Sequence, residues 1–217
     1  MRNGIGDRLK AVRTRRHLSL RELAHLANVS ASLLSQIENG KANPSVESLL
    51  NIAAALKAPI TDFFSDTATT AAGPHDVVAA PALSASEFRL AQMTHAEASM
   101  PVDGEAASGL LITRSAERPT ITLMGGVEWA RLTGRPEQDA EFLETVYPPG
   151  SSSGAHMSHH HGREFALVLE GELTLELGFE RLTLGAGDTI VFNAPTPHRI
   201  SNQSDRPMRA IWVVLNR

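Results

Sequence analysis

The spacing of apolar residues changes once along this chain of 217 residues, and the change divides it into two parts that must fold differently. Near the N-terminus apolar side chains recur every three or four positions, as at Ile5, Leu9 and Val12, which is the spacing of an amphipathic helix. Beyond residue 109 they recur at every second position, in short runs broken by Gly or Pro, which is the spacing of half-buried strands. The pattern predicts two domains, α-helical first and antiparallel β second.

The segment between the two parts has a composition of its own. From Ser65 it is rich in Ala, Thr, Ser and Pro, and it has no sustained amphipathic period until about Glu87. Residues 87–93 suit a short helix, and the rest of 87–108 stays unassigned. We therefore expect a helical domain over 1–66, a linker and connecting segment over 67–108, and a β domain over 109–217.

Capping residues predict where two of the helices begin and end. Ser19 stands three residues before Glu22, the spacing of a capping box at a helix start. Ser30 is a good N-cap for the next helix, and Gly40 can adopt the left-handed conformation that ends it. Asn28 begins the short turn between them, so two short helices should follow each other closely.

Two more helices should complete the helical domain. A fourth begins at Pro44 and Ser45 and carries apolar residues at helical spacing through Leu56. Ile60, Phe63 and Phe64 then close the bundle. The expected architecture is a five-helix, all-α bundle.

The net charge of −4 conceals an uneven distribution of charge. Residues 1–66 carry nine Lys and Arg against six Asp and Glu, a net charge of +3, and seven of the nine cations lie in the first 21 residues. The remainder carries eleven against eighteen, a net charge of −7. A basic cluster on a small domain suits the neutralisation of DNA phosphates, although charge alone fits a solvated helix face equally well.

The composition also limits where the protein can work. There is no cysteine, which excludes disulfides and thiolate metal sites and agrees with a reducing compartment. No stretch approaches 18 consecutive apolar residues, and the N-terminus lacks the apolar run of a secretory signal. We expect a cytoplasmic protein with no membrane partner.

The run LSQIENGKANPS at 34–45 resembles the phage-repressor-like (XRE) helix-turn-helix family, and the resemblance extends over about 5–64. In that family the third helix enters the major groove of duplex DNA. The resemblance implies base contacts from Ala31, Ser32, Ser35 and Gln36, with Ser30 at the start of the helix.

These residue types differ in what they can recognise. Gln36 can offer a donor and an acceptor to adenine, whereas Ala31 can contact only a thymine methyl group. Arg21, Lys41 and Asn43 are the candidates for phosphate contacts. The alternative for each of these residues is an ordinary solvated side chain.

One helix-turn-helix reads few base pairs, too few to select a site among the competing sequences of a genome. A single such motif is visible in this sequence, so we expect a homodimer on a two-fold symmetric operator. The self-association should come from the C-terminal part.

The second domain should be a closed antiparallel barrel or jelly roll, because its runs are short and no helices separate them. That absence of helices excludes a doubly wound parallel sheet. The expected strands are 110–114, 120–124, 128–133, 141–147, 164–170, 172–177, 180–184, 189–192 and 208–215.

Two motifs in this domain resemble those of the cupin family, over about 109–215. The first is partial and the second is the better match. The residues that carry them are Gly150, His156, His160, Glu164 and Gly171 in the first motif, and Gly187, Asp188, Pro197, His198 and Asn202 in the second.

The resemblance implies a metal or ligand site inside the barrel, formed by His160, Glu164 and His198. Imidazole and carboxylate ligands suit Zn, Fe, Mn or Ni. Ser158 stands where the family has another histidine, and His156, His159 or His161 could take its place. The alternative is a metal-free pocket in which these residues bind an organic ligand.

Other interpretations of individual residues stay open. Glu164 could be a buried carboxylate paired with Arg163 or Arg199. Four aromatic residues are candidates either for the pocket or for barrel packing, and packing is favoured: Trp129, Tyr147, Phe192 and Trp212.

The two domains together resemble bacterial regulators in which a cupin barrel senses a small molecule. We expect a sequence-specific transcriptional regulator, without enzymatic activity, whose operator binding is controlled by a small-molecule effector or a metal in the barrel. One alternative is a cupin-type metalloenzyme with an accessory DNA-binding domain. Another is a helical bundle that binds protein, as an antitoxin does.

Overall fold

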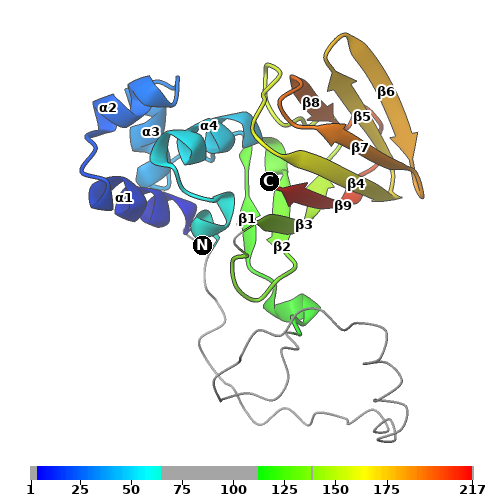
Figure 1. The fold of residues 1–217 in the computed structure, drawn as a ribbon, viewed down its shortest axis with the longest axis horizontal. Coiled ribbons are helices and arrows are strands. Elements are labelled where there is room, and N and C mark those ends of the chain that lie inside the picture. Colours follow the sequence, from blue (N-terminus) through cyan, green and yellow to red (C-terminus); the bar gives the residue numbers. More distant parts are fainter. Residues whose placement is uncertain (1–3, 65–111, 138, 217) are drawn as a thin grey trace, which may run out of the picture. The chain divides into compact units, whose positions relative to one another are not determined.

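A computed structural model describes residues 4–64, 112–137 and 139–216 of the chain (Figure 1). The expected linker over 67–108, including the helix considered at 87–93, lies outside these residues. The N-terminal part is helical and the C-terminal part is an antiparallel β structure, as the spacing of apolar residues predicts. The helices of the N-terminal part are α1 Ile5–Arg15, α2 Leu20–Leu26, α3 Ala31–Glu38, α4 Val46–Leu56 and the 3₁₀ helix η1 Ile60–Phe63.

The predicted caps explain the boundaries of α2 and α3. The Ser19 hydroxyl accepts a hydrogen bond from the Glu22 N–H, and the Glu22 carboxylate accepts one from the Ser19 N–H, which completes the capping box. The Ser30 hydroxyl accepts the Leu33 N–H at 3.0 Å. Each cap satisfies a donor that the first turn of a helix leaves free.

Glycine is required where α3 ends. Gly40 has a φ of +67°, and its N–H donates to the carbonyl of Ile37. The N–H of Lys41 donates to the carbonyl of Gln36, so the two bonds form a Schellman motif. The left-handed C-cap predicted at this glycine is confirmed.

The predicted fifth helix is not an α-helix. Within the described N-terminal residues there are four α-helices, and the fifth element is the single 3₁₀ turn η1. Lys57 ends α4 in a left-handed conformation, and Pro59 precedes η1 with extended backbone. Too few residues remain before Phe64 for a full α-helical turn to repeat, while Ile60 and Phe63 still pack into the core.

The β structure consists of two antiparallel sheets with an intervening set of loops. The larger sheet has the strand order β1-β2-β3-β9-β4-β7, and the smaller has β6-β5-β8. The strands are β1 Thr120–Thr122, β2 Glu128–Arg131, β3 Ala140–Tyr147, β4 Arg163–Glu170, β5 Glu172–Leu177, β6 Glu180–Gly185, β7 Thr189–Asn193, β8 His198–Ser201 and β9 Met208–Leu215. Short 3₁₀ turns lie at η2 Ser115–Glu117 and η3 Met124–Gly126.

The closed barrel is not confirmed, because hydrogen bonding divides the described strands into two sheets. The chain passes from the larger sheet to the smaller one at Gly171, whose φ is +72°. A Cβ atom there would overlap the carbonyl oxygen of Pro207, so only glycine allows this crossing.

One strand prediction was wrong. Residues 112–114 form no strand, and the chain continues into η2; positions 110 and 111 lie outside the described residues. The second cupin motif places Pro197 and His198 at a strand, and β8 does begin at His198, although its four mostly polar residues show no clear alternation.

Alternation along the strands separates the two faces of the larger sheet. On β3 the side chains of Glu141, Leu143 and Tyr147 are buried, whereas Phe142 is 41% exposed. The central strand β9 alternates in the same way over its whole length. The inner face therefore forms one wall of a cavity, and the outer face stays partly open.

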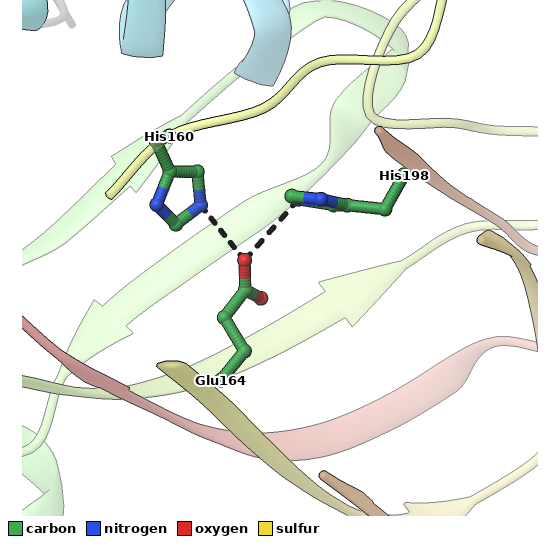
Figure 2. Close-up of side chains that lie close together, drawn as sticks. All are labelled: His160, Glu164 and His198. Atoms are coloured by element: carbon green, nitrogen blue, oxygen red, sulfur yellow. Dashed lines mark ion pairs between the residues drawn. The ribbon is translucent and has the colours of Figure 1, made fainter. Parts of the chain in front are cut away.

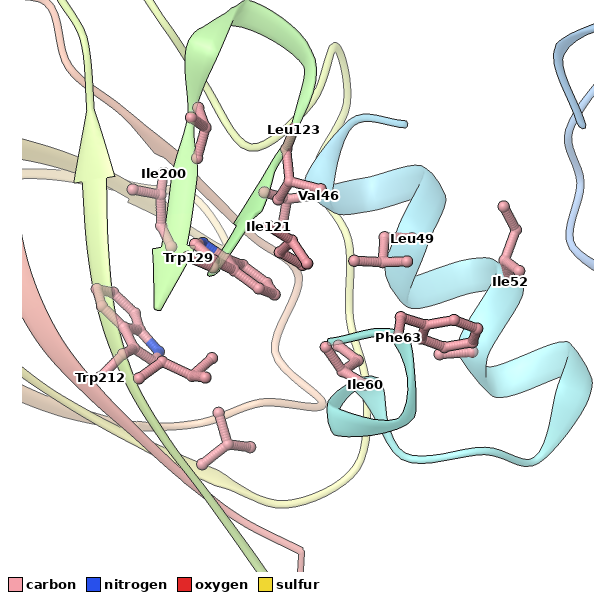
Figure 3. Packing of buried hydrophobic residues seen from close by; sticks show 14 of the residues in the cluster. Val46, Leu49, Ile52, Ile60, Phe63, Ile121, Leu123, Trp129, Ile200 and Trp212 are labelled. Carbon is pink, nitrogen blue, oxygen red and sulfur yellow. The ribbon is translucent and has the colours of Figure 1, made fainter. Parts of the chain in front are cut away.

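The described helices and sheets belong to one compact unit and share a continuous core. Figure 3 shows Val46 of α4 beside Ile121 and Leu123 of the β structure. No described helix has the length and apolar character needed to cross a membrane.

Candidate DNA-binding face and barrel pocket

Helix α3 presents a polar outer face. Leu34 and Ile37 are fully buried on its inner face, whereas Ser32 and Gln36 are exposed on the other. The β structure does not cover this outer face. Its exposed polar side chains are therefore free to contact base edges, as a recognition helix requires.

The remaining candidates at α3 have structural roles. Ala31 is half-buried and packs against the core. The Ser30 hydroxyl already acts as the N-cap acceptor, and the half-buried Ser35 hydroxyl lies 3.4 Å from Nδ2 of Asn39. These three residues shape the helix and its ends, which leaves Ser32 and Gln36 as its most open positions.

The three candidates for phosphate contacts flank α3. Arg21 is exposed at the second position of α2, near a helix N-terminus. Lys41 is exposed and Asn43 half-buried in the loop that follows α3. In this arrangement the flanking residues can contact the DNA phosphates on either side of the groove that α3 would enter.

One cation of the basic cluster has a structural role that the sequence interpretation missed. Arg13 of α1 donates from Nε and Nη2 to the two carboxylate oxygens of Glu38, at 2.6 and 2.8 Å. Glu38 is buried at the end of α3. The hydrogen bond and charge of Glu38 raise the pKa of Arg13, because they outweigh the lowering effect of burial. The pair ties the candidate recognition helix to α1.

Three predicted ligands converge inside the β structure (Figure 2). Nε2 of His160 lies 2.7 Å from Oε1 of Glu164, and Nε2 of His198 lies 3.2 Å from the same oxygen. His160 lies just before β4, Glu164 is on β4 and His198 begins β8. Among the described residues these three form the group whose ligand atoms are close enough to share an ion.

Neighbouring groups fix the orientation of each ligand. Nδ1 of His160 lies 2.8 Å from the carbonyl oxygen of His161, and Nδ1 of His198 lies 2.9 Å from that of Thr196. A carbonyl oxygen can only accept, so each Nδ1 carries a proton. Oε2 of Glu164 accepts a hydrogen bond from the indole N–H of Trp212. The three remaining atoms, two Nε2 and one Oε1, face one another.

This arrangement suits a cation. A neutral imidazole protonated on Nδ1 has a lone pair on Nε2, and here both lone pairs point toward the carboxylate oxygen. Oε1 of Glu164 is buried without a completed hydrogen bond, although two rings face it. Either imidazole protons or a divalent ion would remove the repulsion. The donors, their buried position and their outer hydrogen bonds therefore fit a divalent metal with three protein ligands.

Without a metal, Glu164 and His160 each favour the charged form of the other. Burial raises the pKa of Glu164, but the His160 and His198 rings outweigh this effect and lower it to about 2. Burial lowers the pKa of His160, and the hydrogen bond and charge of Glu164 outweigh this effect, so the pKa is raised. The site is built for one positive charge or more beside the carboxylate.

The other predicted histidines lie outside this group. His156 is exposed, with Nδ1 3.6 Å from Oε1 of Glu47. His161 contributes its carbonyl to His160 and its exposed side chain to the pocket lining. His159 is exposed, and Ser158 pairs with His198 through backbone hydrogen bonds of 2.9 Å. None of them completes a fourth protein ligand in the described residues.

The alternative ion pairs for Glu164 were wrong. Arg199 instead donates to Glu176 at 2.8 Å, and the Arg163 guanidinium lies over the ring of Phe165. The partners of the Glu164 carboxylate are the two histidines and Trp212.

The ligand group lies in a pocket of about 270 Å³. Trp129, Tyr147 and Trp212 line it, so three of the four aromatic candidates belong to the pocket and not only to packing. Phe192 packs edge-on against His198 instead, with ring centroids 5.1 Å apart. The pocket is smaller than the roughly 300–1,000 Å³ typical of drug-sized ligands.

Sequence interpretation missed Glu141. It is buried on β3 and lines the pocket. Burial raises its pKa to about 7. Glu141 and Glu164 both pair with Val214 of the intervening strand β9, so they lie in one row on the inner face. The signal was present, because Glu141 occupies an inward position of an alternating strand.

Comparisons with known proteins assign the helical part and the β structure to two different families. Residues 9–63 match the Helix-turn-helix family, and residues 143–214 match the Cupin domain family. The HTH-type transcriptional regulator PuuR of Escherichia coli is 25% identical over 201 residues, covering 92% of this chain and 88% of its own length.

Two further relatives are similar in part or in fold. The immunity repressor protein of Bacillus phage phi105 is 44% identical over 52 residues, covering 24% of this chain and 36% of its own length. An HTH_3 family transcriptional regulator from Vibrio cholerae superposes with a TM-score of 0.60 at 21% identity, covering 99% of this chain and 96% of that one. The chain therefore carries an XRE-type helix-turn-helix domain at its N-terminus and a cupin domain at its C-terminus.

Proposed function

We propose that this protein is a sequence-specific DNA-binding regulator whose operator affinity is set by a small molecule or metal bound in its cupin pocket. The proposal keeps the domain boundaries 1–66, 67–108 and 109–217, and it places the protein in the cytoplasm with duplex DNA. The observation that carries it is the exposed outer face of α3, with Ser32 and Gln36, in the same compact unit as a pocket that contains the ligand group.

Base reading is assigned first to Gln36 and Ser32. A glutamine amide can form two hydrogen bonds with adenine, and a serine hydroxyl accepts several partners. Arg21, Lys41 and Asn43 supply phosphate contacts on either side. Ser30, Ala31 and Ser35 set the end and the packing of the helix and contribute at most short contacts with the groove.

The metal is assigned to His160, Glu164 and His198. When bound, a divalent ion would act as a Lewis acid and hold an oxygen or nitrogen atom of the effector. The protein residues position it: the carbonyls of His161 and Thr196 orient the rings, and Trp212 holds the carboxylate. His156 and His161 are not assigned as ligands.

A homodimer is part of the proposal because each chain contributes one recognition helix. The outer face of the larger sheet offers a surface for a second copy. An apolar row crosses this face, because four apolar residues on neighbouring strands pair in register. They are Phe142 on β3, Val213 on β9, Phe165 on β4 and Val191 on β7. Phe142 and Val191 are 41% and 46% exposed at its two ends. A two-fold contact between such rows would bury both.

The test is selection of bound duplexes from a random library by the purified full-length protein. We expect a two-fold symmetric consensus, with binding that weakens steeply as salt increases. Recovery of unrelated sequences, with equal affinity for all of them, would contradict the proposal.

An enzyme is the second candidate, and the ligand group is what favours it. Three protein ligands leave positions on a metal open to substrate. Steady consumption of a small substrate by metal-loaded protein, abolished in His198→Ala, would support that candidate against the regulator.

A further inference from the structure

The cupin pocket is not built by the β structure alone. Its lining includes Val46, Leu50 and Ala53 of α4, and Ile60 of η1. These residues come from the helical part that also carries α3. A ligand that fills the pocket would therefore contact the DNA-binding part directly.

Hydrogen bonds hold the start of α4 against the β structure. The N–H of Glu47 is one of the free donors in the first turn of α4, and it donates to the carbonyl of Ser153 at 2.8 Å. The Glu47 carboxylate accepts the His156 N–H at 3.3 Å. The backbone of loop 151–157 thus forms two hydrogen bonds with Glu47, the second residue of α4. It accepts one from the Glu47 N–H and donates the other to the Glu47 carboxylate.

A second bond links the β structure to the loop that follows α3. The N–H of Met124 donates to the carbonyl of Pro44 at 2.9 Å. The same loop carries Lys41 and Asn43, the candidates for phosphate contacts. Movement of α4 relative to the β structure would therefore also move residues assigned to the DNA backbone.

The contact needs a glycine. Gly154 is buried, and a Cβ atom there would overlap Oε2 of Glu47 and lie 2.6 Å from its Cβ. The backbone of Gly154 is not in the left-handed region, so the requirement comes from the close approach of α4 and not from the loop conformation. The loop is shaped to bring this helix against the pocket.

A third connection is deeper in the same unit. Arg131 of β2 is fully buried, and its Nη1 donates to the carbonyl of Thr61 in η1 at 3.3 Å. Its guanidinium lies 5.9 Å from the ring centroid of Phe64. Buried cations are rare without partners, so the helical part and the β structure are matched here in both shape and charge.

We propose that α4 and η1 form one wall of the effector pocket, so that the effector is bound jointly by the DNA-binding and cupin parts and sets the angle between them. This inference rests on the proposed function and names how the pocket would control it. In the described structure α3 keeps its outer face open, so control acts through the placement of α3 and not by covering it. In a dimer, a change of that angle alters the half-site spacing that two recognition helices can reach.

The two walls also define the chemistry of the effector. The wall from α4 and η1 is apolar, whereas the opposite side carries Glu141 and the ligand group. The Tyr147 hydroxyl and the Trp129 indole N–H are buried in the lining, and neither has a hydrogen-bond partner among the described residues. The effector is a compact molecule with a polar end and a hydrocarbon end. Its polar end donates and accepts hydrogen bonds on the side of Glu141 and the ligand group, and its hydrocarbon end lies against α4.

The first test uses the absence of cysteine in this protein. The double variant Glu47→Cys/His156→Cys should be joined by a short thiol-specific crosslinker within one chain. The product should run as a monomer on a denaturing gel, and mass spectrometry of its peptides should show residues 47 and 156 joined by one crosslinker. A product only between chains, or no product, would overturn the proposal that a chain closes its own pocket with α4.

The second test changes the glycine. Gly154→Ala should displace α4 and change operator affinity by about 5-fold or more, the lower end of typical coupling between sites, with a changed preference for half-site spacing. Gly185→Ala is the matched control, because a Cβ atom there meets nothing closer than 3.8 Å. Wild-type affinity and spacing preference in Gly154→Ala would overturn the proposal.

Leu50→Trp keeps the inference testable if Gly154→Ala fails to fold. The larger side chain fills the pocket from the α4 side without changing α3. It should change operator affinity by about 5-fold or more, as expected for Gly154→Ala. Unchanged affinity in this variant would also overturn the proposal. If the wild-type protein binds no duplex specifically, the proposed function fails, and the crosslink still reports whether α4 forms the wall.

Discussion

Arg13 and Glu38 form a two-bond ion pair between α1 and α3, with N–O distances of 2.6 and 2.8 Å. The Glu38 side chain is 4% exposed and that of Arg13 is 13% exposed. The pair therefore fixes the C-terminal end of the candidate recognition helix inside the helical core. A residue that composition assigns to DNA phosphates instead holds the helix that would read the bases.

Replacement of Arg13 should destabilise the helical part. Arg13→Met leaves the Glu38 carboxylate buried and unpaired, which costs about 3 kcal/mol in the free energy of unfolding. Arg15→Met, at an exposed position of the same helix, should change it by less than about 0.5 kcal/mol. Urea unfolding followed by the helical circular dichroism signal measures both. Equal stability of the two variants would show that the pair contributes nothing.

Removal of phosphate contacts should weaken all duplexes alike. Arg21→Ala and Lys41→Ala should each lower the slope of log affinity against log salt concentration by about 1, because one fewer counterion is released. The preferred sequence should stay the same. Arg135→Ala, exposed on a loop of the β structure, is the control. A changed consensus in Arg21→Ala would mean that this residue reads bases.

Binding of a transition metal should be visible through the tryptophans. The protein has two, and both Trp129 and Trp212 line the pocket. Titration with Ni²⁺ should quench their fluorescence. Glu164→Gln and His198→Ala should weaken this binding at least about 10-fold, since even the loss of an outer hydrogen bond can have that effect.

His156→Ala is the control for that titration, because the exposed His156 ring lies outside the ligand group. Ni²⁺ affinity that falls with His156→Ala and persists in Glu164→Gln would show that the ion binds elsewhere. No quenching in the wild-type protein would favour the metal-free pocket.

Association through the larger sheet should depend on its apolar row. Phe142→Glu places a charge at the end of the row and should shift the protein from dimer to monomer in sedimentation velocity experiments. Leu182→Glu is the matched control, since Leu182 is 37% exposed but lies on the smaller sheet. A dimer that survives Phe142→Glu and is lost in Leu182→Glu would assign the interface to the other sheet.

The sequence was sufficient for the helical part where local interactions decide the structure. Ser19, Ser30 and Gly40 form caps with neighbours a few residues away, so their roles follow from spacing. The fifth helix was wrong because η1 is fixed by packing of Ile60 and Phe63 into the core, while Lys57 and Pro59 leave no room for an α-helix.

The pocket could be predicted only in part. His160, Glu164 and His198 are recognisable from motifs, and they do meet. Glu141 belongs to a run with no motif, and its place beside Glu164 depends on the pairing of β3 and β4 with β9. The pairing of Arg13 with Glu38 spans 25 residues, and no local pattern indicates it.

Base discrimination by α3 is the most direct test of DNA recognition by this protein. The full-length protein and its Gln36→Ala variant should be compared on the selected operator and on duplexes with each adenine of a half-site replaced in turn. We expect Gln36→Ala to lose about 1–3 kcal/mol of discrimination at one adenine position while its affinity for unrelated duplexes is unchanged. Full discrimination at every position in both Gln36→Ala and Ser32→Ala would contradict the assignment of α3 as the helix that reads DNA.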